Sequence, residues 1–142
     1  MSNTNIKHCM YTFCILILTS SLPSCNTCKS FGETELGNNF ALVEADEKNK
    51  SILYCTSPKC CYAGITIVPT SVVAFKRNSK WIIAKSADKA GVNYWIIDKE
   101  FTVEFQYDSG MREEIMSHVI GPLDFTAFKK EVKNRQIKLS LD

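Results

Sequence analysis

Residues 80–99 read KWIIAKSADKAGVNYWIIDK, two apolar runs joined by a short polar segment. Trp, Ile and Tyr favour strands, and a connection as short as ADKAG (87–91) favours an antiparallel hairpin. In WIIA (81–84) and YWII (94–97) successive residues are apolar, so both faces of each strand are apolar. We therefore expect these two strands to lie centrally in a sheet, under a covering layer.

Four earlier segments have the same composition and are separated by clusters of Asn, Asp, Gly, Pro and Lys, as strands are. They are FALVEA (40–45), SILYCT (51–56), GITIV (64–68) and SVVAF (71–75). In FTVEFQY (101–107), Phe101, Val103 and Phe105 alternate with polar residues, which predicts a half-exposed strand.

The segment GPLDFTAFKKEVKNRQIKL (121–139) predicts a helix with Asp124 as its N-cap. Leu123 and Phe128 stand at the positions of a hydrophobic staple, and Phe125, Phe128 and Val132 share one helical face. A shorter helix is predicted in GMREEIMSHV (110–119). The expected fold class is α+β, with an antiparallel β-sheet of about five to seven strands packed against the C-terminal α-helix.

The chain has 142 residues, which suits a single domain. Its formal net charge of +2 is too small for the basic stripe of a nucleic-acid-binding protein, so no nucleic-acid partner is expected.

Residues 1–24 differ in character from the rest of the chain. They contain no Asp or Glu, and Lys7 and His8 precede an uncharged run from Cys9 to Leu22. That run is shorter than the roughly 20 residues that span a bilayer, and it fits the apolar region of an export signal. The alternative is a buried N-terminal helix, but polar chain follows at once and no amphipathic period is visible.

The sequence Leu22-Pro23-Ser24-Cys25 at the end of this run resembles the lipobox of bacterial lipoproteins. The resemblance implies that residues 1–24 are a lipoprotein signal peptide and that the Cys25 thiol carries a diacylglycerol. Since each buried methylene contributes about 0.8 kcal/mol, two or three acyl chains would hold the protein in a membrane. Membrane lipid is thus the expected partner, and the mature chain is nearly neutral, with 16 basic and 15 acidic residues.

Residues 26–38, NTCKSFGETELGN, are polar and contain glycine. We interpret 25–38 as the lipidated cysteine with a flexible tether, and 39–142 as one α+β domain. The expected location is the cell envelope, either on the outside of the cytoplasmic membrane or on the outer membrane.

Five segments, in order, resemble a family of uncharacterised small bacterial lipoproteins with a domain of unknown function. They are LGNNFALVEAD, TIVPTSVVAF, KWIIAKS, NYWIID and GPLDFTAFKKE, between residues 36 and 131. The resemblance implies an exported, lipid-anchored domain. It brings no activity, cofactor or catalytic residue with it.

Cysteine is frequent, with seven residues in the chain. Once the export signal and the lipid site are set aside, those left are Cys28, Cys55, Cys60 and Cys61. An even number in an oxidising compartment favours structural disulfides. Cys55 flanks a Pro-containing turn and faces either Cys60 or Cys61, and Cys28 would pair with the remaining thiol. The alternatives are a four-thiolate zinc site, which adjacent cysteines serve poorly, a redox pair, and free thiols.

Catalytic motifs are not visible in the mature chain. His118 follows Ser117 directly, and adjacent side chains rarely form a nucleophile–base pair. Glu113 and Glu114 point to different helix faces, as solvated residues do. No phosphate-binding loop, zinc-protease motif or nucleophile elbow occurs, so we expect neither a catalytic site nor a metal or cofactor.

Two groups of residues suggest binding surfaces. Trp81, Tyr94 and Trp95 would line a ligand groove or, as is commoner for strand aromatics, pack in the core. A basic group crowds the last helix, where it would meet lipid phosphates or an acidic protein, or be merely solvated. Its members are Lys129, Lys130, Lys133, Arg135 and Lys138.

The leading hypothesis for function is a non-enzymatic envelope lipoprotein that binds another macromolecule or contributes to the upkeep of the envelope. Two alternatives are an immunity-like inhibitor of an exported toxin, and a small envelope hydrolase or redox enzyme that uses His118 or a cysteine. A cleft joining His118 to a carboxylate and a hydroxyl would favour the enzyme.

Overall fold

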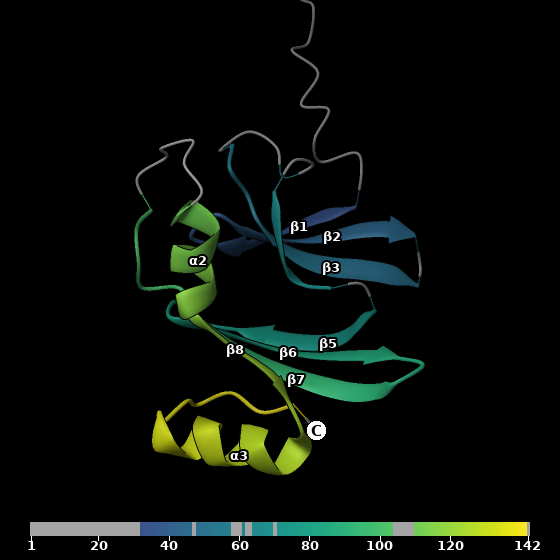
Figure 1. The fold of residues 1–142 in the computed structure, drawn as a ribbon, viewed down its shortest axis with the longest axis vertical. Helices are drawn as coiled ribbons and strands as arrows, with labels where there is room; N and C mark the ends of the chain where they lie inside the picture. Colours follow the sequence, from purple (N-terminus) through teal and green to yellow (C-terminus); the bar gives the residue numbers. More distant parts are fainter. Residues whose placement is uncertain are drawn as a thin grey trace, which may run out of the picture.

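The computed structural model describes residues 32–46, 48–57, 61, 64–69, 71–103 and 110–141. Within them the chain forms two antiparallel four-stranded sheets and two helices (Figure 1). The first sheet has β1 (Glu33–Gly37), β2 (Phe40–Asp46), β3 (Asn49–Tyr54) and β4 (Ile65–Val68) in sequence order. The second has β5 (Val72–Arg77), β6 (Trp81–Asp88), β7 (Gly91–Asp98) and β8 (Val119–Leu123), again in order. The helices are α2 (Gly110–Ser117) and α3 (Phe125–Asn134).

The expected mixture of helix and antiparallel sheet is confirmed, but the expected single sheet is wrong. All six strands predicted between residues 40 and 99 form, yet they divide between two sheets after β4. The reason lies in β6 and β7, which are apolar on both faces and need a cover on each side. The first sheet covers one face and α3 covers the other, as Figure 1 shows.

The core therefore has two layers, one on each side of the second sheet. Between the sheets, Phe40 and Ile52 of the first meet Ile82, Trp95 and Ile97 of the second. On the far side, the side chains of the alternate positions pack under α3. They are Trp81, Ile83, Tyr94 and Ile96. The period-two alternation of a strand thus assigns neighbouring residues to different layers.

The central hairpin pairs β6 with β7 over their full length, from Trp81 opposite Asp98 to Asp88 opposite Gly91. Its turn is held by the Asp88 carboxylate, which accepts hydrogen bonds from the backbone N–H groups of Ala90 (2.8 Å) and Gly91 (3.2 Å). An Asp at this place caps the turn with its own side chain.

Strand β1 lies in the part of the chain that we predicted to be tether. It pairs with β2 through a turn in which Asn38 (φ 50°) and Asn39 (φ 64°) both have positive φ, the conformation of a type I′ hairpin. Leu36 is completely buried in the core between the sheets. The folded domain therefore begins several residues before residue 39. The burial of Leu36 and the turn at Asn38 and Asn39 stabilise a strand here, although most residues of the segment are polar.

Strand β8 contains the pair Gly121-Pro122, two residue types that commonly interrupt regular structure. The strand is at the edge of its sheet, where a proline costs no ladder hydrogen bond. Gly121 has φ 149°, and a Cβ there would lie 2.6 Å from a ring carbon of Trp95. Glycine is therefore required at this position by both conformation and contact.

The strand predicted for residues 101–107 is not seen in its described part. Residues 101–103 are not in a strand, although Phe101 is half-buried, Thr102 exposed and Val103 buried. Residues 104–109, with Phe105, lie outside the described residues.

Candidate functional site

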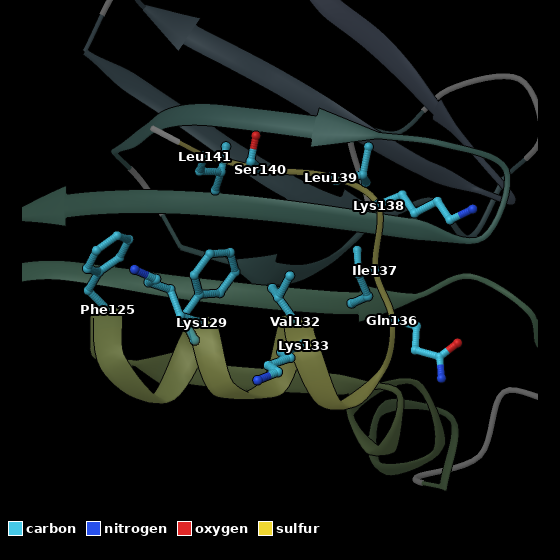
Figure 2. Close-up of a pocket in the computed structure, with 11 residues that line it drawn as sticks. Phe125, Lys129, Val132, Lys133, Gln136, Ile137, Lys138, Leu139, Ser140 and Leu141 are labelled. Carbon is cyan, nitrogen blue, oxygen red and sulfur yellow. The ribbon is translucent and has the colours of Figure 1, made fainter.

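An apolar groove with a volume of about 700 Å³ runs between α3 and the C-terminal segment 136–141 (Figure 2). Its apolar lining side chains come from both walls. They are Phe125, Phe128, Val132, Ile137, Leu139 and Leu141. The volume lies within the range of roughly 300–1,000 Å³ that is usual for small-molecule sites.

The start of α3 fixes one wall of the groove. Asp124 has an extended backbone, and its carboxylate accepts a 2.8 Å hydrogen bond from the N–H of Ala127, which confirms the predicted N-cap. Phe128 stacks on the ring of Tyr94 of β7, with the ring centroids 4.9 Å apart. Leu123 packs in the same apolar cluster as Phe128, as a hydrophobic staple requires. The helix is thereby held on the second sheet.

The end of α3 produces the other wall. Gln136 has φ 53°, its N–H donates to the Lys133 carbonyl, and the Ile137 N–H donates to the Val132 carbonyl. These two bonds form a Schellman motif, in which a left-handed residue reverses the chain. Residues 137–141 then run back along α3, as Figure 2 shows, and enclose the groove.

Three lysines border this apolar surface. Lys129 and Lys133 come from α3, one turn apart, and Lys138 comes from the returning segment. The ammonium of Lys129 lies 5.1 Å from the centroid of the Phe125 ring, within cation–π range. None of the described lining residues is acidic. The groove is therefore an apolar trough with a positive rim.

The predicted basic surface corresponds to this rim only in part. Lys130 and Arg135 are exposed and do not line the groove, and Arg135 pairs instead with Glu131 at 3.3 Å. The prediction placed Lys138 in the last helix, but α3 ends at Asn134, so Lys138 belongs to the extended segment. The sequence signal that we missed is IKLSL (137–141), whose alternating apolar residues are typical of an extended chain with one buried side.

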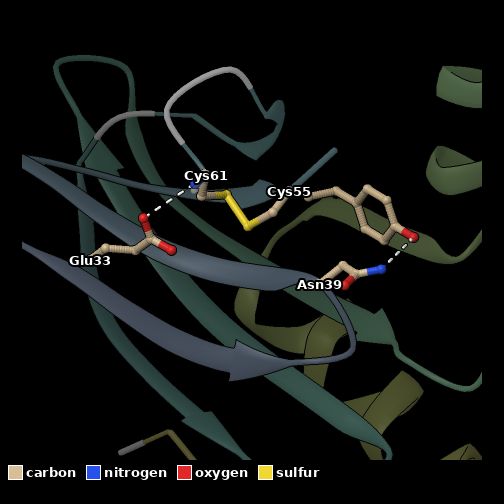
Figure 3. The surroundings of a disulfide bond; sticks show 5 residues. Glu33, Asn39, Cys55 and Cys61 are labelled. Atoms are coloured by element: carbon tan, nitrogen blue, oxygen red, sulfur yellow. Dashed lines mark hydrogen bonds between the residues drawn. A yellow bond between two sulfur atoms is a disulfide. The ribbon is translucent and has the colours of Figure 1, made fainter. Parts of the chain in front are cut away.

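A disulfide joins Cys55 to Cys61, across a Cα–Cα distance of 4.5 Å (Figure 3). This is one of the two pairings that we considered for Cys55. Both residues are buried and pack with Ala41 and Leu53 on the outer face of the first sheet. Cys28 and Cys60 lie outside the described residues.

Glu33 lies beside this disulfide and accepts a 3.3 Å hydrogen bond from the Cys61 N–H (Figure 3). One carboxylate oxygen and the two sulfurs are all within 4.8 Å of one another, as metal ligands would be. Metals bind thiolates, however, and both sulfurs are already joined to each other. As it stands, this cluster serves the structure of the first sheet.

The candidate catalytic residues do not assemble into a site among the described residues. The His118 ring stacks on Phe101, with centroids 4.0 Å apart and planes 7° apart. The Ser117 hydroxyl donates a 2.6 Å hydrogen bond to the Glu114 carbonyl, within its own helix. Glu113 and Glu114 are both exposed. The structure therefore does not join His118 to a hydroxyl and a carboxylate in the described part of the chain.

The three strand aromatics that might have lined a groove belong to the core. Trp81, Tyr94 and Trp95 are all buried. The Trp95 indole N–H donates a 2.9 Å hydrogen bond to the buried Ser86 hydroxyl, which satisfies both groups.

Lys99 is a buried cation that no sequence motif indicates. Its side chain is 2% exposed, and its ammonium donates a 2.8 Å hydrogen bond to the Leu36 carbonyl. Burial lowers the pKa of Lys99 below the usual lysine value, and the positive charge of Arg77 lowers it further. The Lys99 carbonyl accepts a 2.7 Å hydrogen bond from the Asn38 side chain, so this residue ties the end of β7 to the first sheet.

Fold and groove together define a small two-sheet α+β protein with one basic-rimmed apolar trough in its described part. No family model matches the chain, and no curated protein or solved structure is significantly similar to it. The lipobox residues, including Cys25, lie outside the described residues. Within the described part, the helices are all too short or too polar to cross a bilayer.

Proposed function

We propose that the protein is a non-enzymatic lipoprotein of the cell envelope, anchored through an acylated Cys25, that binds a ligand in the groove along α3. The observation that carries the binding proposal is the groove itself, an apolar trough of about 700 Å³ whose floor is formed by the outer side of the second core layer. A site of this size and lining is the usual form of a small-molecule site.

The anchor is supported by the sequence. An uncharged run follows Lys7 and His8 and ends in Leu22-Pro23-Ser24-Cys25, as in bacterial lipoproteins. The segments that resemble a family of small bacterial lipoproteins, from LGNNF to GPLDF, support the same location.

The layer order determines where an anchored protein would present its groove. The described chain begins beside the first sheet, and α3 lies at the other end of the molecule (Figure 1). Because packed layers are about 10 Å apart, roughly 20 Å separates β1 from the groove. Residues 26–31 reach about 20 Å when fully extended, at roughly 3.5 Å per residue. A domain that stands on the end where the described chain begins would present the groove to the aqueous compartment.

The anchor is tested by Cys25→Ser in the producing cells. We expect the variant to leave the membrane fraction or to remain unprocessed, because the acyl chains and the signal cleavage both depend on this thiol. Cys28→Ser is the matched control and should stay in the membrane. An unchanged membrane fraction and an unchanged mass for Cys25→Ser would disprove the anchor.

The binding site is tested with the anchored protein extracted in native nanodiscs and examined by native mass spectrometry. We expect a bound small molecule that disappears in Val132→Trp, because the larger side chain fills the groove. Val73→Trp, on the exposed side of β5, is the control and should keep the adduct. An adduct that persists equally in both variants would place the ligand elsewhere.

A further inference from the structure

We propose that the groove takes a single-chain amphiphile with an anionic head group, bound as a monomer with its hydrocarbon chain along the apolar floor and its head group at the lysine rim. The inference rests on the proposed binding function and names the chemistry of the ligand. Three features of the groove carry it, namely its floor, its charge and its size.

The floor suits a hydrocarbon chain. Apolar side chains of α3 face apolar side chains of the returning segment, with Phe128 and Ile137 buried beneath them. Such a trough gains binding energy from any apolar surface that it removes from water. It offers little to a compact polar ligand, because its polar groups lie at the border.

The rim suits an anion. Within the described residues, no carboxylate pairs with Lys129, Lys133 or Lys138, and the nearest acidic residue of the helix, Glu131, pairs with Arg135. The three lysines give the border of the trough a positive charge, which attracts an anionic head group more than a neutral one. A neutral amphiphile would bury its hydrocarbon chain on the apolar floor, but it would have no electrostatic attraction to the lysines.

The size of the groove favours a small ligand over a macromolecular surface. A volume of about 700 Å³ lies in the range that is usual for small-molecule sites, and α3 and the returning segment bound the groove on two sides. The described chain also begins at the end of the molecule opposite the groove. We therefore assign a free amphiphile in the aqueous compartment as the ligand, rather than the surface of a bilayer.

The test compares two probes with the same chain length and different charge. Decanoate and decanol are titrated calorimetrically into the processed lipoprotein in phosphatidylcholine nanodiscs, with empty nanodiscs as the reference. We expect one site that binds decanoate about tenfold more tightly than decanol, and a decanoate affinity that falls as salt is raised, because salt screens exposed charges.

Matched variants assign the charge effect to the rim. The double variant Lys133→Gln/Lys138→Gln should lower decanoate affinity about five- to tenfold, since exposed charge pairs are each worth a small factor, and leave decanol binding unchanged. The control Lys76→Gln/Lys130→Gln removes the same charge from exposed positions outside the groove and should change neither affinity.

Each contrary outcome points to a different error. Equal affinities for decanoate and decanol would overturn the anionic head group while leaving a groove that binds. Binding of neither probe would overturn the amphiphile, and the native adduct lost in Val132→Trp would then still uphold the proposed function. A third outcome is that the protein sediments with phosphatidylglycerol vesicles, that this binding requires Lys133 and Lys138, and that decanoate does not compete with the vesicles. The surface would then bind bilayers, and the proposal would be wrong.

Discussion

At the scale of single residues, Lys99 is the most unusual feature of the structure. A lysine is rarely this buried, and this one has a carbonyl rather than a described carboxylate as its partner. Gly37 adjoins it, since a Cβ at that glycine would lie 3.2 Å from the ammonium nitrogen. The lysine thus fills a space between the first hairpin and the end of β7 that is shaped for its long, straight side chain.

Lys99 should make stability depend on alkaline pH. Its pKa in the folded protein is below the ordinary value of 10.5, so between these two pKa values the unfolded chain binds more protons than the folded one. The free energy of unfolding should therefore rise with pH across that window, as the cost of the buried ammonium disappears. Lys99→Met keeps the apolar stem and should remove this rise.

The free energy of unfolding is measured in urea at intervals between pH 7 and 10.5, and the value for the variant is subtracted from the value for the wild type at each pH. Lys76→Met removes an exposed lysine of β5 and serves as the control. If the free energies of unfolding of wild type and Lys99→Met differ by a constant amount over the whole pH range, Lys99 titrates as an ordinary lysine.

At the scale of elements, the end of α3 is decisive for the groove. The residue that reverses the chain, Gln136, has a left-handed conformation that costs a non-glycine residue roughly 1 kcal/mol. The Schellman motif requires that conformation, and it brings Ile137 back against Val132.

Gln136→Gly should therefore stabilise the protein by about 0.5–1 kcal/mol, because glycine adopts the left-handed region without the steric cost. Thermal unfolding checks the sign, and Ser140→Gly is a control in the extended part of the same segment, where the change should be neutral or unfavourable. A lower melting temperature for Gln136→Gly would show that the glutamine side chain contributes more than its backbone costs.

Most elements could be predicted from the sequence, because six strands and α3 have clear local signals, and α2 has a weaker one. WIIA and YWII reveal strands buried on both faces, and Asp124 reveals a helix start. The two strands that we did not predict, β1 and β8, have compositions that are unusual for strands. Residues 33–37 contain one large apolar residue, Leu36, and β8 contains Gly121-Pro122. Both segments are extended because they pair with a neighbouring strand, β1 with β2 and β8 with β7.

The candidate site was predictable only on its helical side. The helix period placed Lys129 and Lys133 on α3, near the apolar face of Phe128 and Val132. The second wall depends on where α3 ends, and the sequence there contains no glycine to signal a C-cap. Gln136 adopts the left-handed conformation without a local signal for it, so the return of residues 137–141 was not foreseen.

At the scale of the whole molecule, the two sheets share one core. Ile52 of the first sheet and Ile97 of the second are both fully buried in the same apolar cluster. Neither sheet can bury its inner face without the other, so we expect the domain to unfold in one transition.

Ile52→Val should destabilise both sheets equally, by about 0.5–1.5 kcal/mol, since it removes one buried methylene from their common core. Trp81 and Trp95, the two tryptophans of the chain, both lie in the second sheet, so their fluorescence reports on the sheet that does not carry the mutation. Fluorescence and far-ultraviolet circular dichroism should shift together in urea. If the urea midpoint measured by fluorescence stays fixed while the midpoint measured by circular dichroism moves, the two sheets unfold separately. Val73→Ala, at an exposed position, is the control.

The sequential order of the two sheets has a consequence for biosynthesis. A ribosome completes β1 to β4 before it makes β6 and β7, which cover their inner face. Ile97 follows Ile52 by about 45 residues, which take roughly 2–9 s to translate at 5–20 residues per second. During that interval the nascent chain exposes Phe40 and Ile52 and has no partner sheet for them. A chain that emerges from its N-terminus, whether from a ribosome or from an export channel, is therefore most open to aggregation when about half of it has emerged.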